Sequence, residues 1–257
     1  MDVKITRWAA WAPGLTGRED WLAWFESPRI PEGEEKPALP FIPAMVRRRY
    51  SLLSRMVLQA AYDCCPPEQL ANVNVVTATR FGELSTCLEL LKVISRDEPV
   101  SPIGFSHSVH NAPAGHFSIS AVNTAPSSTV SGMDDTFSYG FLEGLSVLHR
   151  QPGYPVLLLV GEDRIPEDYL AVITAKPFPH AVALLLEPAD ETTEESFERV
   201  AFDWGQHSVG QQAHLAMAGT GFEIPPVIHF LHWLNSKEPE IVLRSTRQSC
   251  RWSRRVA

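Results

Sequence analysis

The strongest constraint on the fold is a series of short apolar runs that alternate with helical segments. The runs are VNVVTAT (73–79), SSTVSGM (127–133), PVLLLVGED (155–163) and AVALLLEP (181–188). They are too short for helices of typical length, and their β-branched, apolar character favours buried strands. Because helical patterns separate several of them, the sequence predicts an α/β fold with a mostly parallel or mixed sheet that is covered on both faces.

The rest of the chain extends this pattern. The helical segments are expected at 18–26, 47–64, 80–95, 105–117, 134–150 and 225–235, and further strands at 2–9, 199–205 and 240–245, the last strand of the chain. Proline punctuates residues 27–43, which we expect to form a surface loop. Residues 189–199 are acidic and read as a solvated connection, and five arginines follow in the final segment 244–257.

Composition excludes several classes of function. The chain has 257 residues, 44% of them hydrophobic, and a net charge of −8, which argues against nucleic acid as the main partner. No apolar run reaches the length of a membrane-spanning helix, and the N-terminal residues lack the pattern of a signal peptide. The four cysteines show neither zinc-ligand spacing nor a disulfide framework. We therefore expect a soluble cytoplasmic protein without a metal or another cofactor.

Two adjacent carboxylates, Asp134 and Asp135, lie where a predicted strand runs into a predicted helix. Acidic side chains in the first turn of a helix are favoured by the helix dipole, so capping is the simplest interpretation. Proton transfer and Mg²⁺ binding are the chemical alternatives. Ser131 precedes the pair without the G-x-S-x-G pattern of a hydrolase nucleophile.

Three histidines, His107, His110 and His116, lie close together in a segment rich in small residues. The spacing of the first two would suit a metal ion, but no cysteine or acidic residue lies near enough in sequence to complete a set of ligands. A structural or interface role is therefore the simpler interpretation of this segment.

The segments SVHNAPAGHFSIS (108–120) and APSSTVSGMDDTFSYGFLEGLSVL (125–148) together resemble the β-ketoacyl synthases of the thiolase fold. The resemblance implies a layered α/β/α fold. It also implies that residues 1–190 form the domain equivalent to the N-terminal half of a synthase. Residues 191–257 would then be a strongly reduced C-terminal extension that packs on the same core.

The resemblance also implies that the chain has lost the synthase reaction. Asp134 falls at the position of the nucleophilic cysteine, and a carboxylate cannot replace the thiolate that accepts the acyl chain. The stretch 218–221 (AGTG) echoes the turn that carries one catalytic histidine, but Ala218 stands at the histidine position. Nothing in the sequence resembles the turn that carries the second histidine, so no catalytic residue is assigned.

Type II polyketide systems contain such cysteine-free partners, the chain-length factors. TRFGELSTCLELL (79–91) and SVHNAPAGHFSI (108–119) resemble the chain-length-factor-like subunits of aryl polyene biosynthesis. The implied partners are a full-length β-ketoacyl synthase, bound as a heterodimer, and an acyl carrier protein. The implied dimer strand is Ser127, Ser128, Thr129, Val130 and Ser131, and the implied interface and tunnel residues are Ser106, Val109, His110, Ala112 and Phe137.

Two further hypotheses remain at this point. Arg251, Arg254 and Arg255 form part of a basic tail that is either solvated or docks an acidic carrier protein. The alternative function is a stand-alone acyl-carrier-protein decarboxylase or hydrolase that uses Asp134 or Ser131. A homodimeric carrier-binding scaffold is the third possibility.

Overall fold

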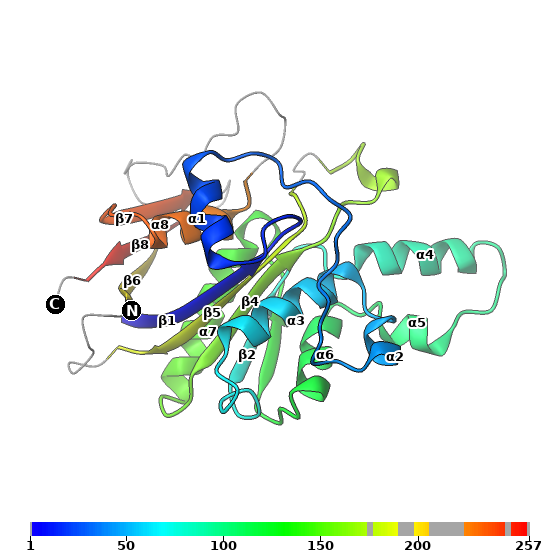
Figure 1. Cartoon of the computed structure of the whole chain (residues 1–257), viewed down its shortest axis with the longest axis horizontal. Coiled ribbons are helices and arrows are strands. Elements are labelled where there is room, and N and C mark those ends of the chain that lie inside the picture. The colour runs from blue at the N-terminus through cyan, green and yellow to red at the C-terminus, as the bar shows by residue number, and fades with distance from the viewer. Residues whose placement is uncertain (1, 174–176, 190–197, 206–223, 245–247, 256–257) are drawn as a thin grey trace.

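A computed structural model describes residues 2–173, 177–189, 198–205, 224–244 and 248–255, and the elements discussed here lie in these ranges (Figure 1). Eight strands form one mixed sheet in the order β3-β2-β4-β5-β1-β6-β8-β7. The strands are β1 (Asp2–Trp11), β2 (Asn74–Ala78), β3 (Ser127–Val130), β4 (Val156–Glu162), β5 (His180–Pro188), β6 (Glu198–Gly205), β7 (Glu240–Arg244) and β8 (Ser249–Arg254). The α-helices are α1 (Arg18–Glu26), α2 (Ala44–Arg47), α3 (Leu52–Cys64), α4 (Leu84–Ile94), α5 (Pro102–Ser106), α6 (Ala112–Ser120), α7 (Thr136–Arg150) and α8 (Pro226–Leu234). The 3₁₀ helices η1 (Met133–Asp135) and η2 (Glu167–Tyr169) complete the set.

The sheet is parallel in one part and antiparallel in the rest. Strands β3, β2 and β4 run parallel, with Val75 of β2 paired to Ser127 on one side and to Leu157 on the other. Parallel strands need crossover connections: α4, α5 and α6 lie in the chain between β2 and its neighbour β3, and α7 leads from β3 past β2 to β4. From β5 onward each described pair is antiparallel. The expected mixed sheet is confirmed.

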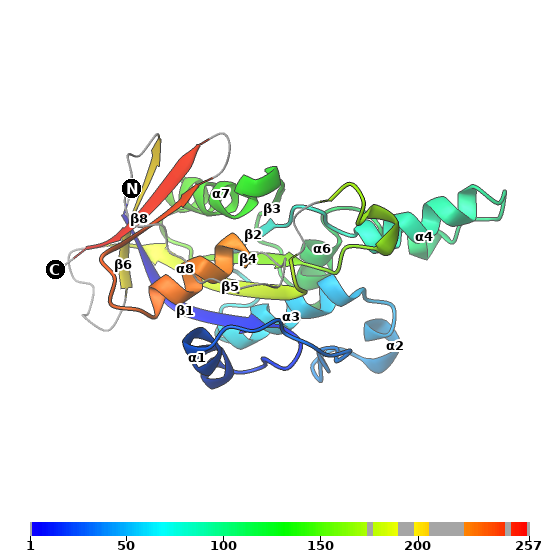
Figure 2. The same ribbon diagram turned by 90° about the horizontal axis from the view of Figure 1, so that it is seen from above.

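Helices cover both faces of the sheet, and β4 shows how its sequence supports this arrangement. Leu157 and Leu159 point into a core cluster with α3 and α6, whereas Val156, Leu158 and Val160 point into a second cluster with α7 and α8. A strand that is apolar at every position is the pattern expected when both faces are buried. Figure 2 shows α3 and α7 on opposite sides of the sheet, which confirms the layered α/β/α fold.

Strand β1 joins the two parts of the sheet. Val3 pairs with Pro188 of β5 and with Val200 of β6. The register shifts between Ile5 and Arg7, and such a bulge increases the local right-handed twist. Strands β6, β8 and β7 therefore continue the same sheet at a different inclination, on the side where α7 lies (Figure 2).

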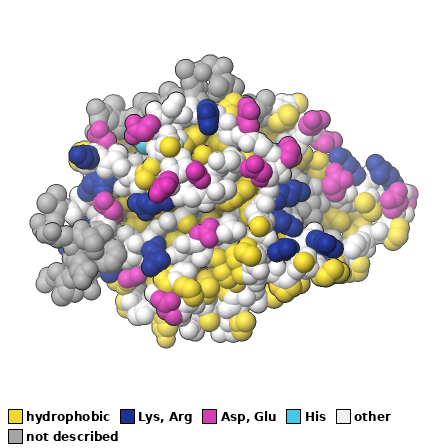
Figure 3. All heavy atoms as spheres, viewed as in Figure 1, with side chains coloured by type: hydrophobic (Ala, Val, Ile, Leu, Met, Phe, Trp, Pro, Cys, Tyr) yellow, Lys and Arg dark blue, Asp and Glu magenta, His cyan; other side chains and the backbone are white. Residues whose placement is uncertain are grey.

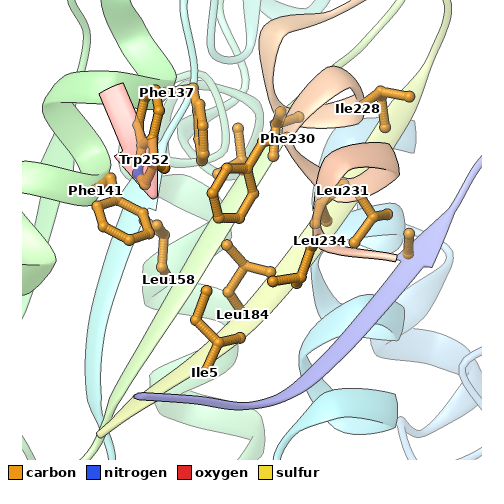
Figure 4. Close-up of a cluster of buried hydrophobic side chains, with 14 of the residues drawn as sticks. Ile5, Phe137, Phe141, Leu158, Leu184, Ile228, Phe230, Leu231, Leu234 and Trp252 are labelled. Carbon is orange, nitrogen blue, oxygen red and sulfur yellow. The ribbon is translucent and has the colours of Figure 1, made fainter. Parts of the chain in front are cut away.

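An aromatic cluster fills the space between α7 and this twisted part of the sheet (Figure 4). Phe137 of α7 stacks on Trp252 of β8 with ring centroids 5.4 Å apart, and Phe141 lies 5.7 Å from Phe230 of α8. Phe202 of β6 adds a ring 5.2 Å from Trp252. Each side chain is almost fully buried, so α7 is enclosed on two sides.

Several predicted boundaries were wrong, for identifiable reasons. The segment 47–64 is interrupted because Ser51 caps a new helix, α3, by accepting from the amide of Ser54. The segment 105–117 is divided between α5 and α6, because Pro113 favours a helix start at the first turn of α6. The strand expected at 127–133 ends at Val130. The chain does not end its sheet at 240–245, since β8 follows with Trp252 turned into the core.

Helices α4 and α5 form an arm that extends beyond the sheet (Figure 1). Leu91 and Ile94 of α4 and Phe105 of α5 are more than half exposed. The arm is tied to the body through Lys92, whose ammonium lies 3.3 Å from Asp168. Hydrophobic side chains also gather on the lower part of the face shown in Figure 3, in the region of α6, α2 and α5. None of the helices in the described ranges is long and apolar enough to cross a membrane.

Candidate functional site at the open sheet edge

The carboxyl ends of the three parallel strands meet at one edge of the sheet. The register places Ala78 of β2 between Val130 of β3 and Val160 of β4. The loops that follow parallel strands therefore converge, which is where α/β proteins usually build their sites. This convergence brings Arg80 and Asp134 together although they are 54 positions apart in sequence.

Asp134 is held in an ion pair with Arg80, with 2.5 Å between carboxylate and guanidinium. The same guanidinium lies over the ring of Phe81, 4.9 Å from its centroid. The hydroxyl of Ser131 donates to the backbone carbonyl of Arg80 at 3.1 Å. The carboxylate at the expected nucleophile position is thus already neutralised, and the neighbouring serine hydroxyl is bound to the backbone. Neither arrangement resembles a nucleophile paired with a base.

Glu162, at the end of β4, positions the loop that carries Arg80. Its carboxyl group accepts hydrogen bonds from the backbone amides of Arg80 and Phe81 and from the hydroxyl of Thr79. Burial raises the pKa of Glu162 to about 7, and the three hydrogen bonds oppose that rise. Sequence reasoning missed Arg80 and Glu162. The sequence did contain a sign of both residues. Each of two buried parallel strands has a charged residue at or just after its carboxyl end, and neighbouring carboxyl ends must lie close together.

The turn between β3 and α7 is held by a threonine and not by the two acids. The amide of Gly132 donates to the hydroxyl of Thr136 at 3.0 Å, and that hydroxyl donates to the carbonyl of Met133 at 2.7 Å. Asp135 occupies the capping position of α7 but makes no side-chain capping bond. The acids therefore lie at the N-terminal end of the helix as expected, but Asp135 does not cap it through a side-chain hydrogen bond. Met133 takes the strained backbone of the turn, with φ at 56°, and is 56% exposed.

The predicted tunnel residues separate into exposed and buried ones. Ser106 and Val109 are exposed, the latter by 42%. Ala112 at the start of α6 and Phe137 in α7 are buried within this chain. Of these four residues, only Ser106 and Val109 are exposed.

His110 is half-buried behind the loop that follows β2. Its Nε2 donates to the carbonyl of Thr79 at 3.0 Å. Its ring also lies against Gly82, where an added Cβ atom would come within 2.4 Å of the imidazole. Gly82 also has a φ of 57°, so glycine is needed here both for its backbone conformation and for the lack of space beside the imidazole. Among the described residues, no group of three or more histidines, cysteines and acids is arranged to hold a metal ion.

A buried polar relay fixes α6 against α3. The hydroxyl of Ser54 donates to Glu83 at 2.8 Å and lies 3.0 Å from Nδ1 of His116. The imidazole of His116 stacks on Tyr50 at 4.1 Å. Burial, and then the neighbouring His107, lower the pKa of His116 to about 4. Burial likewise raises the pKa of Glu83. The relay holds α6 at a fixed depth on the sheet.

Strand β3 is the free edge of the sheet beside this site. Amides of the β2 region donate to the carbonyl oxygens of Pro126 and Val130, each at 3.1 Å. Because alternate residues of a strand bond to opposite neighbours, the backbone groups of Ser127 and Thr129 point away from β2. No described strand lies beyond β3. The edge can therefore accept another strand.

The C-terminal arginines are engaged within the chain. The guanidinium of Arg254 donates to the carbonyls of Trp233 and Ser236 at 2.9 and 2.8 Å, at the C-terminal end of α8. A cation there also complements the helix dipole. Arg251 and Arg255 form exposed ion pairs with aspartates of β6 and β1. Arg254 is a structural residue, and the histidine-like turn at 218–221 lies outside the described residues.

These observations define a layered α/β/α protein in which a strand–turn–helix element carries an aspartate paired with an arginine. Residues 21–253 match the family model described as "Beta-ketoacyl synthase, N-terminal domain". The chain therefore belongs to the β-ketoacyl synthase N-terminal domain family. No curated protein matches its sequence.

Solved structures agree with this assignment. One match is a chain of the ketosynthase ApeO in complex with its chain length factor ApeC from Xenorhabdus doucetiae. It is 30% identical, with a TM-score of 0.78 over 99% of this chain and 100% of that chain. The ishigamide ketosynthase/chain length factor matches at 15% identity, with a TM-score of 0.60 over 80% and 68% of the two chains. A β-ketoacyl synthase from Burkholderia phymatum STM815 matches at 12% identity, with a TM-score of 0.58 over 82% and 66%. The last two show the fold alone.

Proposed function

We propose that this chain is the non-catalytic, chain-length-factor-type partner of a full-length β-ketoacyl synthase. The observation that carries the proposal is the open edge of β3, which leads into a turn where Asp134, at the position that the resemblance assigns to the nucleophile, is paired with Arg80. The match to a chain from a ketosynthase/chain length factor complex supports it. A chain that offers a strand edge and lacks a nucleophile there fits a partner subunit better than an independent synthase.

In this proposal β3 pairs antiparallel with the equivalent strand of the synthase. The backbone groups of Ser127 and Thr129 supply the free donors and acceptors, so that one sheet continues across the dimer. Ser128 and Val130 bond to β2 and fix the register, and Ser131 continues the edge toward the turn. Main-chain pairing supplies affinity, and the side chains at the edge supply specificity.

We propose further that the segment before α6 limits the length of the acyl chain. Ser106 and Val109 are exposed, so they are the side chains able to line a tunnel of the partner. His110 and Ala112 would hold this segment against the body of the protein, His110 through its hydrogen bond to the carbonyl of Thr79. Phe137 is buried in the core and would not line the tunnel. The relay of Glu83, Ser54 and His116 keeps this wall at a fixed depth.

The finer points of the proposal rest on the resemblance. The product class is an aryl polyene, and the growing chain is delivered by an acyl carrier protein. Residues 1–190 form the synthase-like domain and 191–257 its reduced extension. Of the C-terminal arginines, Arg251 and Arg255 are the ones with exposed guanidinium groups for an acidic carrier, since Arg254 is engaged at the end of α8.

A stand-alone hydrolase or decarboxylase has less support in the geometry. It would need Ser131 or Asp134 beside a base, but the hydroxyl of Ser131 donates to a backbone carbonyl and Asp134 is ion-paired with Arg80.

The proposal is tested by co-expression with a full-length β-ketoacyl synthase of the same organism. We expect a 1:1 complex by size-exclusion chromatography and native mass spectrometry, and chain elongation only by the complex. The isolated chain, incubated with acyl-carrier protein, should show no acyl adduct in its intact mass. A stable acyl adduct on this chain, or elongation by the chain alone, would overturn the proposal.

A further inference from the structure

Four non-glycine residues of the described chain have a positive φ: Leu39 (46°), Asp97 (56°), Val122 (51°) and Met133 (56°). This backbone conformation is unfavourable for side chains other than glycine, asparagine and aspartate, and most unfavourable for β-branched ones. Leu39 is fully buried, so the core holds it in place. Asp97, at the end of α4, is of a type that tolerates the conformation. Val122 and Met133 are apolar, and they are 76% and 56% exposed.

The two exposed residues lie at opposite ends of β3. Val122 follows α6, where the amide of Asn123 donates to the carbonyl of Ser118 at 2.9 Å and closes the helix. Glycine is the residue that such a helix end usually carries. Met133 lies in the turn after β3, three residues beyond Val130. Strand β3 is therefore flanked in sequence by two exposed apolar side chains on strained backbone, one before it and one after it.

Strained residues persist where their surroundings hold them, and they concentrate at sites that bind something. Here no described residue of the same chain covers the two side chains. Glycine at either position would relieve the backbone strain. We infer that Val122 and Met133 are paired anchors for the synthase subunit, each inserting into an apolar pocket that flanks the partner's edge strand. This inference rests on the proposed function.

The edge itself argues for this occupant. The outward backbone groups of β3 are satisfied best by another strand, so the covering molecule is a protein chain that contributes a sheet edge. Ile119, one turn before Val122, is 76% exposed and extends the apolar surface on that side. Apolar anchors next to a newly paired strand would exclude water from its hydrogen bonds.

The test is a competition for a limiting amount of the synthase. Wild-type chain and one variant are co-expressed with it at equal levels, and the ratio of the two chains in the purified complex is measured by mass spectrometry. In the purified complex, Val122→Gly and Met133→Gly should each be at least tenfold less abundant than the wild-type chain. Asp97→Gly, a change at the same backbone conformation in the arm, should stay within twofold of wild type. Thermal unfolding of the isolated variants should show melting temperatures equal to or above that of wild type.

The outcomes distinguish a failure of the anchor inference from a failure of the proposed function. Incorporation of both glycine variants at the wild-type level would overturn the anchors while the heterodimer stands. Failure of the wild-type chain to join the synthase would instead overturn the proposed function. Depletion from a homodimer but not from the heterodimer would also overturn the inference, since it would make a second copy the occupant. If a glycine variant does not fold, Val122→Asn and Met133→Asn, which suit the backbone and remove the apolar group, replace it and should be depleted equally.

Discussion

The two ends of the sheet differ in whether their apolar side chains are buried by the rest of the chain. At the closed end, formed by β6, β8, β7 and α8, the aromatic cluster encloses one side of α7. At the open end, formed by β3, α6 and the arm of α4 and α5, apolar side chains are exposed to solvent beside the edge strand β3. Strand β7 is the edge at the closed end, and among the described residues neither edge strand has an outer neighbour. The closed end carries its own core, whereas the open end has the features of an interface.

The charged residues do not show this contrast. Near the closed end, the guanidinium of Arg254 donates hydrogen bonds to carbonyl oxygens at the C-terminal end of α8. Near the open end, Arg80 forms an ion pair with Asp134. Charged groups stabilise structure at both ends, and the difference between them lies in the uncovered apolar surface. Stability should therefore depend mainly on the closed end and association mainly on the open end.

The largest expected effect concerns the closed end. Trp252 is fully buried against Phe137, Phe141, Phe202 and Phe230, so Trp252→Ala should lower the free energy of unfolding by about 3–5 kcal/mol. Trp252→Phe keeps a ring in the cluster and should cost markedly less. Urea denaturation of each variant measures this. Equal losses for alanine and phenylalanine would mean that ring packing does not hold this end.

Acid should weaken the fold through two buried histidines. Burial lowers the pKa of His116, near the open end, and of His180, in the middle of the sheet, to about 4, against 6.5 for an unperturbed histidine. Between these values the unfolded state binds more protons, so stability falls as pH drops from 6.5 to 4. Each histidine contributes about 3 kcal/mol at the acid end. The buried carboxyl groups of Glu162, Glu83 and Asp163 act in the opposite direction, since burial raises their folded pKa, so the expected slope is smaller than the two histidines alone would give.

Denaturation at pH 6.5 and pH 4.5 measures this slope. His180→Gln, which retains a neutral donor for the carbonyl of Phe178, should lose less stability than the wild type when the pH falls from 6.5 to 4.5. A variant whose loss equals that of the wild type would contradict the assignment of a neutral buried histidine.

At the open end, proline substitutions separate association from folding. Thr129→Pro removes an amide that points away from β2, so the complex with the synthase should weaken at least tenfold, about 1.4 kcal/mol, with little loss of stability. Val130→Pro, one residue on, removes an amide that faces β2 and should destabilise the isolated chain. Titration calorimetry and thermal unfolding distinguish the two effects. Undiminished affinity in Thr129→Pro would show that β3 is not the paired strand.

The smallest effect on the fold is expected at the proposed tunnel wall. Val109 is 42% exposed, so Val109→Trp should change the free energy of unfolding by about 0.5 kcal/mol or less. Its added volume should nevertheless shorten the product of the complex, as should Ser106→Phe one turn earlier. The mass and absorption maximum of the product report this. Complexes that assemble and still make full-length product with either substitution would place the limit elsewhere.

The sequence predicted the sheet better than the site. Runs such as PVLLLVGED are apolar at every position, so their burial follows from local pattern alone. Strand β8 was missed because arginines surround Cys250 and Trp252 and conceal their alternation. The pair of Arg80 and Asp134 could not be found locally, since it depends on the register between β2 and β3. The acids themselves were noticed, but the partner of Asp134 lies in the loop that follows another strand.

Hydrogen–deuterium exchange tests the contrast between the two ends most directly. Exchange is followed in peptides covering residues 122–133 and 240–254, in the isolated chain and in the chain bound to the synthase. Binding should protect the amides of Ser127 and Thr129 and leave β7 and β8 unchanged. Unchanged exchange at β3, with protection at β7 and β8 instead, would place the interface at the closed end and contradict this account.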